Sequence, residues 1–502
     1  MTDFDLVVIG GGINGAAIAR DAAGRGVRVL LAEQSDLASA TSSASTGLIH
    51  GNLRGLQDRR LRLVRQSVAE RELLLRLAPH LVRPLRLVLP HQGGLRSASA
   101  RRFGFWLYNR LGTPWRAGGG RIDLTRGGIG VPLKQGFRLG FALFDCRADD
   151  SRLVVLNALD AAERGAVIRT HTRVVRADRD GLIWRLTLNV RGQRDVVTAR
   201  VLINATGPWV ANIMERVLRL KTRARLRLVK GSHILVPRLF EHDNGYMLER
   251  ADGRIVYAIP QGPDFTLIGP TEQEFRGDPA TAFASPEEIT DLCRAASVFF
   301  RESVGPEQVV RTYAGVRVLY QDSSSMSQVT VHDYALARDA PYREAPLLTV
   351  YGGNLTTHRR LAEQALAAVA PYLVMAPAWT HTAPLPGGDF PSEGFDALVW
   401  RAWGRWPFLD PSHARRLVAA YGTRLDRVLG HARHPDDLQP RFGSELTPAE
   451  VRYMRRCEWA QSAEDVLWRR SKLGLRLTSD DVAALTRFLA EFPRENSSAA
   501  AE

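Results

Sequence analysis

The amino-acid sequence predicts an α/β fold followed by a helical C-terminal domain, and three observations support this prediction. First, the short apolar strand at Asp5–Ile9 leads directly into a glycine-rich turn and a segment with helical periodicity. Second, Pro346–Thr357 repeats the order of strand, paired glycines and helix start. Third, a linker rich in proline and glycine begins at Pro384, and helix-forming patterns with tryptophan and leucine follow it. A chain of 502 residues is long enough for two or three domains.

The first glycine-rich turn has the features of a dinucleotide-binding site. Gly10, Gly12 and Gly15 fit the pattern G-x-G-x-x-G between a strand and a helix. The first glycine permits the turn, the second lets the backbone approach a pyrophosphate, and the third lets the helix pack against the strand. The helix N-terminus adds partial positive charge for the phosphates. A second strand ends at Glu33, whose carboxylate can accept hydrogen bonds from a ribose diol and disfavours a 2′-phosphate there.

Later segments indicate which dinucleotide binds. Arg200–Trp209 reads as a buried strand that ends in Ala-Thr-Gly, which places Thr206 and Gly207 beside the adenosine half of a cofactor. Val174 and Val175 lie on an alternating strand where they can flank an adenine, although both residues also suit an ordinary core strand. Of the two strand-glycine-helix junctions, one can hold the pyrophosphate while the other meets a ring system. The sequence therefore predicts a flavin between them.

The stretch Thr41–Gln57, T-S-S-A-S-T-G-L-I-H-G-N-L-R-G-L-Q, is rich in hydroxyl side chains and glycine. A surface loop can have this composition, because such residues form turns. The stretch begins eight residues after Glu33, so it leaves the ribose end of the cofactor and runs toward the flavin. Four residues are therefore predicted hydrogen-bond partners of the pyrophosphate and the ring: Thr41, Ser42, Ser43 and Ser45.

Composition and charge narrow the classes of partner. Apolar residues make up 45% of the chain and charged residues 24%, which is ordinary for a globular protein. The formal net charge of +15, carried mainly by arginine, indicates an anionic substrate, nucleic acid or membrane surface, unless it reflects only a coding bias toward arginine. The three cysteines have no metal-type spacing, which predicts no metal site and a reducing compartment. The N-terminus lacks signal-peptide features, and no apolar run suits a spanning helix.

Seven motifs, taken together, resemble the aerobic, FAD-dependent glycerol-3-phosphate dehydrogenase family. They are G-G-G-I-N-G-A, A-T-S-S-A-S, L-I-H-G, N-A-T-G-P-W-V, K-G-S-H-I, G-V-R and Y-G-G-N-L-T-T-H-R-R-L-A-E. The resemblance continues through W-P-F-L-D at Trp406–Asp410 and V-L-W-R-R-S-K-L-G-L at Val466–Leu475. It covers essentially the whole chain in family order.

The resemblance implies the architecture in more detail. It implies an FAD-binding Rossmann-type domain of the glutathione-reductase and D-amino-acid-oxidase type, an inserted mixed-sheet domain that faces the substrate and the membrane, and a helical C-terminal domain. The linker at Pro384 supports the last boundary independently. The implied division is 1–75, 145–215 and 310–383 for the FAD-binding domain, 76–144 and 216–309 for the mixed-sheet domain, 388–495 for the helical domain and 496–502 for a flexible tail.

The implied reaction is the oxidation of sn-glycerol 3-phosphate, or a related polyol phosphate, to the ketone, which for glycerol 3-phosphate is dihydroxyacetone phosphate. Hydride passes to flavin N5, and the electrons then pass to a membrane quinone. Such chemistry needs a group that accepts the hydroxyl proton and a cation that stabilises the developing alkoxide. The resemblance places His233 and Arg317 at the substrate face of the flavin. A histidine with its usual pKa of about 6.5 can act as the neutral base, and the sequence leaves open whether His233 or His50 does so.

The predicted site residues form three groups. Catalysis is assigned to His233, Arg317 and His50, and substrate binding to Arg54, Arg317, His332 and Asn354. Cofactor binding is assigned to a larger set: Gly10, Gly12, Asn14, Gly15, Glu33, Thr41, Ser42, Ser43, Ser45, His50, Val174, Val175, Thr206, Gly207, Gly352, Gly353, Asn354, Leu355 and Thr356.

The chain departs from the family pattern near the expected substrate. Charge-assisted contacts to a phosphate contribute about 1.5–3 kcal/mol each, so the loss of two or more weakens binding by orders of magnitude. Two alternatives to the family reaction therefore stay open: a different hydroxy substrate, or a catalytically weakened FAD-binding sensor or partner protein. The departures are Gly47 and Asn354 in place of lysines, Gly55 for a tyrosine, His332 for an arginine, Asn52 for a glycine, Gln57 for a glutamate and Pro270 for a threonine.

The segment Leu95–Arg116 interleaves arginines with aromatic residues, among them Phe105, Trp106 and Tyr108. This mixture suits the headgroup boundary of a membrane. The aromatics can instead be buried in a soluble domain, and nucleic acid is a weaker alternative because no recognised module accompanies the segment. The resemblance favours a cytoplasmic enzyme attached peripherally to the inner face of the cell membrane, with an anionic membrane surface and quinone as partners and no nucleic acid. It leaves a homodimer open.

Overall fold

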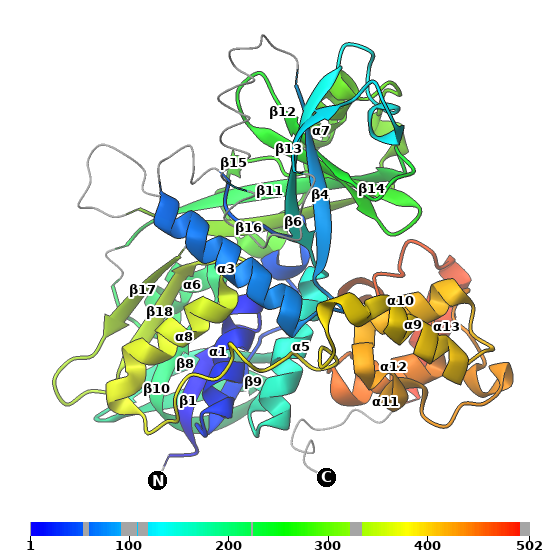
Figure 1. The fold of residues 1–502 in the computed structure, drawn as a ribbon. Helices are drawn as coiled ribbons and strands as arrows, with labels where there is room; N and C mark the ends of the chain where they lie inside the picture. Colours follow the sequence, from blue (N-terminus) through cyan, green and yellow to red (C-terminus); the bar gives the residue numbers. More distant parts are fainter. Residues whose placement is uncertain are drawn as a thin grey trace.

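The computed structural model describes residues 2–53, 60–91, 108, 119–221, 224–321 and 334–491. These residues form two β-sheets and a separate group of helices (Figure 1). In Figure 1 the first sheet lies at the lower left, the second at the top and the helical group at the lower right. The predicted combination of an α/β part, a mixed sheet and a helical C-terminal part is confirmed.

The first sheet is built on parallel strands from distant parts of the chain. Its order is β17-β18-β10-β1-β2-β7. β8 and β9 form an antiparallel hairpin, and β9 pairs with β10. β1 pairs in parallel with both β2 and β10, and its apolar residues are buried, as is usual in parallel sheets. The bounds are β1 (Phe4–Ile9), β2 (Val29–Ala32), β7 (Val167–Arg169), β8 (Thr172–Asp180), β9 (Ile183–Val190), β10 (Gln193–Asn204), β17 (Tyr334–Asp339) and β18 (Leu347–Gly352).

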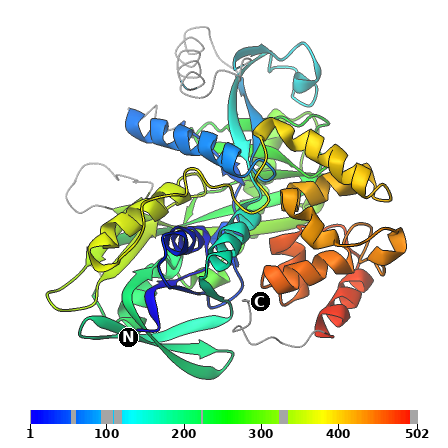
Figure 2. The same cartoon turned by 60° about the horizontal axis from the view of Figure 1, so that its bottom comes forward.

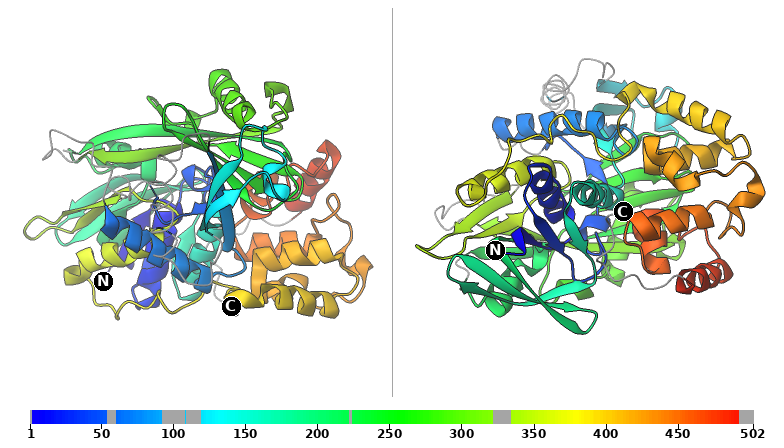
Figure 3. Two further views of the ribbon diagram at one scale, coloured as in Figure 1. Left: turned by 45° about the horizontal axis from the view of Figure 1, so that its top comes forward. Right: turned by 90° about the horizontal axis from the view of Figure 1, so that it is seen from below.

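Three helices cover one face of this sheet. α1 (Ile13–Gly24) packs against α5 (Asp150–Glu163) and α8 (His358–Val369), and the apolar side chains of all three join one core with the strands. The right-hand view of Figure 3 shows α1 and α5 side by side. A second apolar cluster, which includes the buried Trp184 of β9, covers the other face. Both faces of the parallel sheet are therefore buried.

The second sheet is mixed, with the order β15-β11-β14-β13-β12-β4-β6-β3. β16 pairs with β11, and β5 pairs with β6. α7 (Pro286–Phe299) packs against this sheet and begins with a capping box formed by Ser285 and Glu288. The bounds are β3 (Leu48–Ile49), β4 (Arg83–His91), β5 (Gly120–Asp123), β6 (Leu139–Arg147), β11 (Arg225–Pro237), β12 (Gly245–Glu249), β13 (Ile255–Gln261), β14 (Phe265–Gly269), β15 (Gln273–Glu274) and β16 (Arg311–Gln321).

The pairing of β11 with β16 brings predicted catalytic residues together. Its register sets His233 opposite Tyr313 and Arg317 opposite Val229. Because side chains alternate along a strand, His233 and Arg317 lie on the same face of the sheet. The division predicted from the sequence assigns β16 to the FAD-binding part, whereas its hydrogen bonds join it to the second sheet. The same holds for β3, which pairs with β6.

The C-terminal helices have a core of their own and lie beside the first sheet (Figure 2). Several ion pairs connect them to the rest of the molecule, among them Arg470 with Asp36 at 2.7 Å and Arg152 with Glu458 at 2.5 Å. In the part of the chain that the structure describes, no helix has the length and apolar character to cross a membrane. The main helices are α9 (Phe395–Arg405), α10 (Pro411–Tyr421), α11 (Leu425–Leu429), α12 (Pro448–Cys457) and α13 (Ser479–Ala490).

Candidate functional site

The predicted phosphate turn links β1 to α1. Gly10 has a φ of +109°, and a Cβ atom there would lie 2.7 Å from the carbonyl oxygen of Ala205. A Cβ atom at Gly15 would lie 1.9 Å from the carbonyl oxygen of Gly10. Turn and helix therefore pack backbone against backbone, as the glycine pattern predicts. The N-terminus of α1 is held at the end of β1, which is the position in which such a turn binds a pyrophosphate.

Glu33 and Ser42 both contact this turn. The Glu33 carboxylate accepts hydrogen bonds from the backbone N–H of Gly11 at 2.6 Å and of Ser35 at 2.8 Å. Burial raises the pKa of Glu33, although these two hydrogen bonds oppose the shift. Ser42 Oγ accepts from the N–H of Ile13 at 3.1 Å, and it would lie 3.2 Å from a Cβ atom at position 12. The start of Thr41–Gln57 therefore reaches the N-terminus of α1.

Asn14 joins the two strand-glycine-helix junctions. Its Nδ2 donates to the carbonyl oxygen of Gly352 at 2.9 Å, although 338 residues separate the two in the chain. Gly353 has a φ of +91°, and a Cβ atom there would lie 2.6 Å from Asn14 Nδ2. Asn14 Oδ1 is buried and accepts no hydrogen bond from the described residues. This acceptor is therefore left for a ligand donor at the meeting point of the two junctions.

The other hydroxyl groups of the stretch are bonded to the protein itself. Thr41 Oγ1 donates to the carbonyl oxygen of Val316 on β16 at 2.5 Å, and Ser43 Oγ donates to that of Ala40 at 3.2 Å. Ser45 Oγ donates to Asp150 Oδ2 at 2.7 Å. Their protons are therefore committed to protein acceptors, and only their lone pairs can serve a cofactor. The contact through Thr41 places the stretch beside the strand that carries Arg317.

Asp150 and Lys472 hold this loop, a role that no local sequence pattern indicates. Lys472 Nζ lies 2.5 Å from Asp150 Oδ1, while the other carboxylate oxygen accepts from Ser45. The pKa of Lys472 is raised, because nearby Asp149 and Asp150 outweigh the opposing effect of burial. Lys472 belongs to V-L-W-R-R-S-K-L-G-L, so this C-terminal motif anchors an N-terminal loop. The motif itself was the only sequence signal.

The residues predicted around the adenosine half of the cofactor differ in where they lie in the structure. Thr206 adjoins Gly10, where its Cα would be 3.0 Å from a Cβ atom, and its hydroxyl donates to Asn204 at 2.7 Å. Gly207 follows with a φ of +56°. Val174 packs in the apolar cluster beneath the first sheet, whereas Val175 is exposed at an irregularity in the β8–β9 pairing. Of the two valines, only Val175 presents its side chain outside the core.

His50 is held in one tautomer by its own loop. Its Nδ1 accepts the backbone N–H of Asn52 at 3.1 Å, so a neutral ring carries its proton on Nε2. Its backbone N–H donates to Thr356 Oγ1 at 3.1 Å, which ties the loop to the second glycine junction. Asn354 Oδ1 accepts from the N–H groups of Thr356 and Thr357 at 2.8 and 3.0 Å and so fixes the turn before α8. Buried Leu355 lies in the same turn.

His233 differs from His50 because its ring forms no hydrogen bond with the described residues. It is 3% exposed, and neither ring nitrogen has a hydrogen-bond partner among the described residues. The ring packs against Gly269, where a Cβ atom would lie 2.5 Å from His233 Cδ2. Arg317, on the same face of the sheet, forms an ion pair with Glu272. Glu272, which lies between β14 and β15, is a further residue of this site, and its ion pair with Arg317 identifies its position.

The electrostatic surroundings keep His233 neutral. Burial is the larger cause and the positive charge of Arg317 the smaller one, and together they lower the pKa of His233 from 6.5 to about 4. Because an imidazole is uncharged above its pKa, His233 is a neutral proton acceptor throughout the ordinary physiological range.

Replacement of Arg317 with methionine is expected to raise the pKa of His233, because the repulsive charge is removed while the burial remains. An acid limb of kcat/KM that reports His233 then moves from near pH 4 to a higher pH, still below 6.5. The pH profile of kcat/KM measures this shift independently of the loss in absolute rate. Arg227→Met, on an exposed position of β11, is the matched control. An acid limb at the same pH in Arg317→Met and the parent would contradict the assignment.

Two departures from the family pattern occur where the backbone is left-handed. Gly47 has a φ of +64°, and a Cβ atom there would lie 2.6 Å from the carbonyl oxygen of Ala148. The turn is closed by the N–H of Ala148, which donates to the Gly47 carbonyl oxygen at 2.7 Å. A lysine does not fit this backbone, so its loss is coupled to a tight turn. Asn52 has a φ of +59°, a conformation that asparagine tolerates better than most residues.

Several predicted residues lie outside the described ranges. These include Arg54 and His332, and also Gly55 and Gln57. Of the Leu95–Arg116 segment only Tyr108 is described. Its ring is fully buried, and its hydroxyl donates to Asp145 at 2.6 Å and accepts the N–H of Gly51 at 2.7 Å. This one aromatic is therefore an internal anchor rather than part of a membrane-facing surface.

Comparison with known proteins places these features in context. A family model described as FAD dependent oxidoreductase matches residues 5–359, and a model of the C-terminal domain of alpha-glycerophosphate oxidase matches residues 378–497. A glycerol-3-phosphate dehydrogenase of Pseudomonas aeruginosa is 45% identical over 488 residues, which cover 97% of this chain and 95% of that protein. A D-erythritol 1-phosphate dehydrogenase of Brucella abortus is 40% identical over 488 residues, which cover 96% of this chain and 97% of that protein.

A solved structure has the same fold. The X-ray structure of a glycerol-3-phosphate dehydrogenase from Bacillus halodurans, complexed with FAD, aligns with a TM-score of 0.76 and 25% identity. The alignment covers 97% of this chain and 93% of that one.

Proposed function

Because this chain belongs to the glycerol-3-phosphate dehydrogenase family of FAD-dependent oxidoreductases, we propose that it oxidises the secondary hydroxyl of a polyol phosphate to a ketone. The first candidate substrate is sn-glycerol 3-phosphate, with dihydroxyacetone phosphate as the product. The observation that carries the proposal is the bare, neutral ring of His233 on the same strand pair as Arg317. A neutral base and a fixed cation are the two groups that alcohol oxidation requires of the protein.

The residues around the two glycine junctions fit FAD. The N-terminus of α1 would hold the pyrophosphate, Glu33 the ribose diol, and the buried, unpartnered Oδ1 of Asn14 a donor of the cofactor. Bound FAD supplies the hydride acceptor.

The protein groups have separate roles in this proposal. His233 accepts the hydroxyl proton, since its low pKa keeps the ring uncharged before the reaction. Arg317 stabilises the developing alkoxide with its planar guanidinium, and Glu272 positions that guanidinium through the ion pair. His50 is a positioning residue, because its Nδ1 is occupied by a backbone N–H and its Nε2 carries a proton. This arrangement favours His233 as the base.

We further propose that the electrons pass to a membrane quinone and that the cytoplasmic protein attaches peripherally to the inner face of the cell membrane. The formal net charge of +15 supports attraction to an anionic lipid surface. Hydrogen peroxide formed when air is readmitted to the reduced protein would instead identify oxygen as the acceptor.

Anaerobic reduction of the bound flavin tests the proposed reaction. Addition of sn-glycerol 3-phosphate is expected to bleach the flavin absorbance of the purified FAD-loaded protein, whereas unphosphorylated glycerol at the same concentration leaves it unchanged. Titration with dithionite provides the fully reduced reference. An oxidised spectrum after addition of every polyol phosphate tested would refute the proposed function.

A second candidate substrate is D-erythritol 1-phosphate, the substrate named for the 40% identical Brucella abortus relative. It is favoured by the smaller side chains at Gly47 and Asn354, where the family pattern has lysines, and by the capping role of Asn354 Oδ1. A kcat/KM at least tenfold higher for D-erythritol 1-phosphate than for sn-glycerol 3-phosphate would select it. The reverse ratio would select glycerol 3-phosphate.

A further inference from the structure

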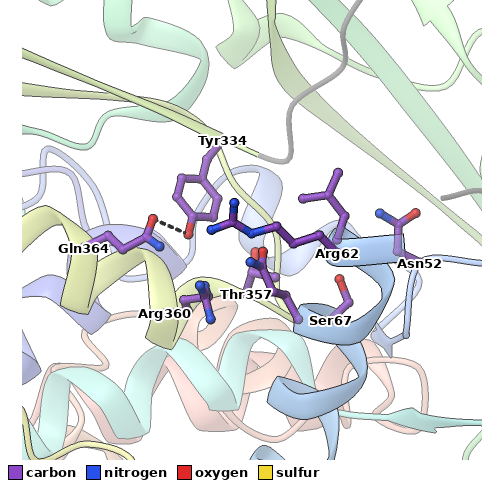
Figure 4. A pocket seen from close by; sticks show the side chains of 9 residues that line it. Asn52, Arg62, Ser67, Tyr334, Thr357, Arg360 and Gln364 are labelled. Atoms are coloured by element: carbon purple, nitrogen blue, oxygen red, sulfur yellow. Dashed lines mark hydrogen bonds between the residues drawn. The ribbon is translucent and has the colours of Figure 1, made fainter. Parts of the chain in front are cut away.

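A cavity of about 260 Å³ lies where the start of α3 (Leu61–Leu77) meets the start of α8 (Figure 4). It is smaller than the roughly 300–1,000 Å³ pockets that hold drug-sized ligands, so it suits a compact group with a short carbon chain. Its lining residues come from α3, α8, the first residue of β17 and the loop after His50: Asn52, Arg62, Leu63, Gln66, Ser67, Tyr334, Thr357, Arg360 and Gln364.

Two arginines bring uncompensated positive charge into this cavity. Arg62 reaches into it from α3 and Arg360 from α8 (Figure 4). Among the residues that the structure describes, no carboxylate lines the cavity, and neither guanidinium forms an ion pair with any of them. With its amide oxygen turned toward them, Gln66 accepts from Arg62 Nε at 3.2 Å and from Arg360 Nη2 at 3.3 Å. A neutral amide thus bridges two like charges.

The neighbouring arginine of α8 has carboxylate partners that Arg360 lacks among the described residues. Arg359 forms a buried ion pair with Glu70 at 2.6 Å and a second one with Glu363. Arg360, one residue later, has none among the described residues, and its Nε is buried without a hydrogen-bond partner. Arg360 is partly buried, whereas Arg62 is exposed. Partial burial of the Arg360 guanidinium without a counter-charge is unfavourable, so a bound anion would stabilise this arrangement.

The remaining polar groups complete an oxyanion site. Tyr334 donates its hydroxyl proton to Gln364 Oε1 at 2.8 Å, which orients that amide so that its NH₂ group stays available as a donor. The hydroxyl group of Ser67 lines the same space, whereas that of Thr357 already donates to Asn354 Oδ1 at 3.3 Å. Two guanidinium groups with additional neutral donors match a phosphate, which has several acceptor oxygens and is bound by arginine in two places at once.

The cavity adjoins the predicted catalytic loops. Asn52 donates its backbone N–H to His50, and the N–H of Thr357 donates to Asn354 Oδ1. We propose that this cavity binds a phosphate monoester through Arg62 and Arg360. The phosphate is either that of the polyol phosphate, which rests on the proposed function, or a second phosphate bound beside the reaction site. Asn52 contributes a side chain to the cavity at a position where the family pattern has glycine.

Binding of inorganic phosphate to the FAD-loaded full chain, measured by isothermal titration calorimetry at constant ionic strength, tests the site directly. Arg62→Gln and Arg360→Gln are each expected to weaken phosphate binding at least tenfold, with the bound flavin spectrum unchanged. Arg65→Gln is the matched control, since it removes the same charge from an exposed position of α3 outside the cavity. Absence of phosphate binding to the parent, or equal affinity in the parent and the double variant, would overturn the proposal.

Steady-state kinetics identify the source of the phosphate. If the cavity holds the phosphate of the substrate, inorganic phosphate is a competitive inhibitor, and both variants raise KM at least tenfold with kcat changed less than twofold. If it holds a second phosphate, the variants weaken inhibition by inorganic phosphate while KM stays within twofold of the parent. Either result supports the site. The two proposals can fail separately. If no polyol phosphate reduces the bound flavin but phosphate binding still depends on Arg62 and Arg360, the proposed function is refuted and the phosphate site stands.

Discussion

Replacement of His233 with asparagine is expected to lower kcat by about 100- to 10,000-fold, the usual contribution of a positioned general base. The buried ring is the only group proposed to take the hydroxyl proton, and both of its nitrogens lack a protein partner within the described ranges. Asparagine keeps a polar side chain of smaller size but has no basic nitrogen. The measurement is kcat with an artificial electron acceptor, and flavin absorbance checks that the cofactor stays bound.

A second buried histidine supplies the matched control. His413 lies in α10, its Nε2 also has no partner among the described residues, and burial lowers its pKa to about 4, as for His233. His413→Asn therefore carries the same change in composition and burial at a site far from the proposed chemistry. Its kcat is expected within twofold of the parent. Parent-like kcat in His233→Asn would remove His233 from the mechanism and return the role of the base to another group.

Replacement of Gly15 with alanine is expected to weaken FAD binding by about 100-fold, which corresponds to about 2.8 kcal/mol. The added Cβ atom would lie 1.9 Å from the carbonyl oxygen of Gly10, so backbone must move rather than a flexible side chain. Movement of the turn displaces the N-terminus of α1, where the pyrophosphate is expected to bind. The dissociation constant of FAD from the apoprotein, measured by flavin fluorescence, reports the effect.

Two further glycine variants test whether the loss of FAD affinity follows the closeness of the new Cβ contact. At Gly12 the new Cβ atom would meet, among the described residues, only Ser42 Oγ at 3.2 Å, so Gly12→Ala is expected to lose less affinity than Gly15→Ala. At Gly404 in α9 a Cβ atom would have no described atom within 4 Å outside its own helix backbone and chain neighbours, so Gly404→Ala is expected to leave FAD binding unchanged and to stabilise the helix by about 0.5–1 kcal/mol. Equal FAD affinity in Gly15→Ala and Gly404→Ala would show that the close approach in the turn does not govern cofactor binding.

The residues of the glycine turn could be predicted from the sequence, because their function depends on neighbours in the chain. A strand, three spaced glycines and a helix start define one local geometry through backbone sterics alone. The acidic residue at the end of the second strand follows from the same short unit. For the second junction, the sequence predicts only that both glycine junctions contact the same cofactor. It does not predict the hydrogen bond between Asn14 and Gly352, because no local pattern relates residues that are 338 positions apart.

The sequence does not distinguish His50 from His233 as the proposed base. Both histidines lie in motifs of the same family, and the chain contains no signal that separates them. The difference lies in a backbone N–H that occupies His50 Nδ1 and in the burial of His233 beside Arg317. Both are consequences of how distant strands and loops pack.

By itself, the sequence determined the fold class, the glycine-rich turn between β1 and α1 and the FAD-dependent family. These properties depend on short-range sterics, hydrophobic periodicity and motif order, all of which are present in the linear chain. Only the tertiary structure decided that the His233 ring is buried without a partner among the described residues, that Lys472 anchors the hydroxyl-rich loop through Asp150, and that two arginines share a cavity that no described carboxylate lines. The reason is physical: burial, strand register and the partner of each charge are set by contacts between residues far apart in the sequence.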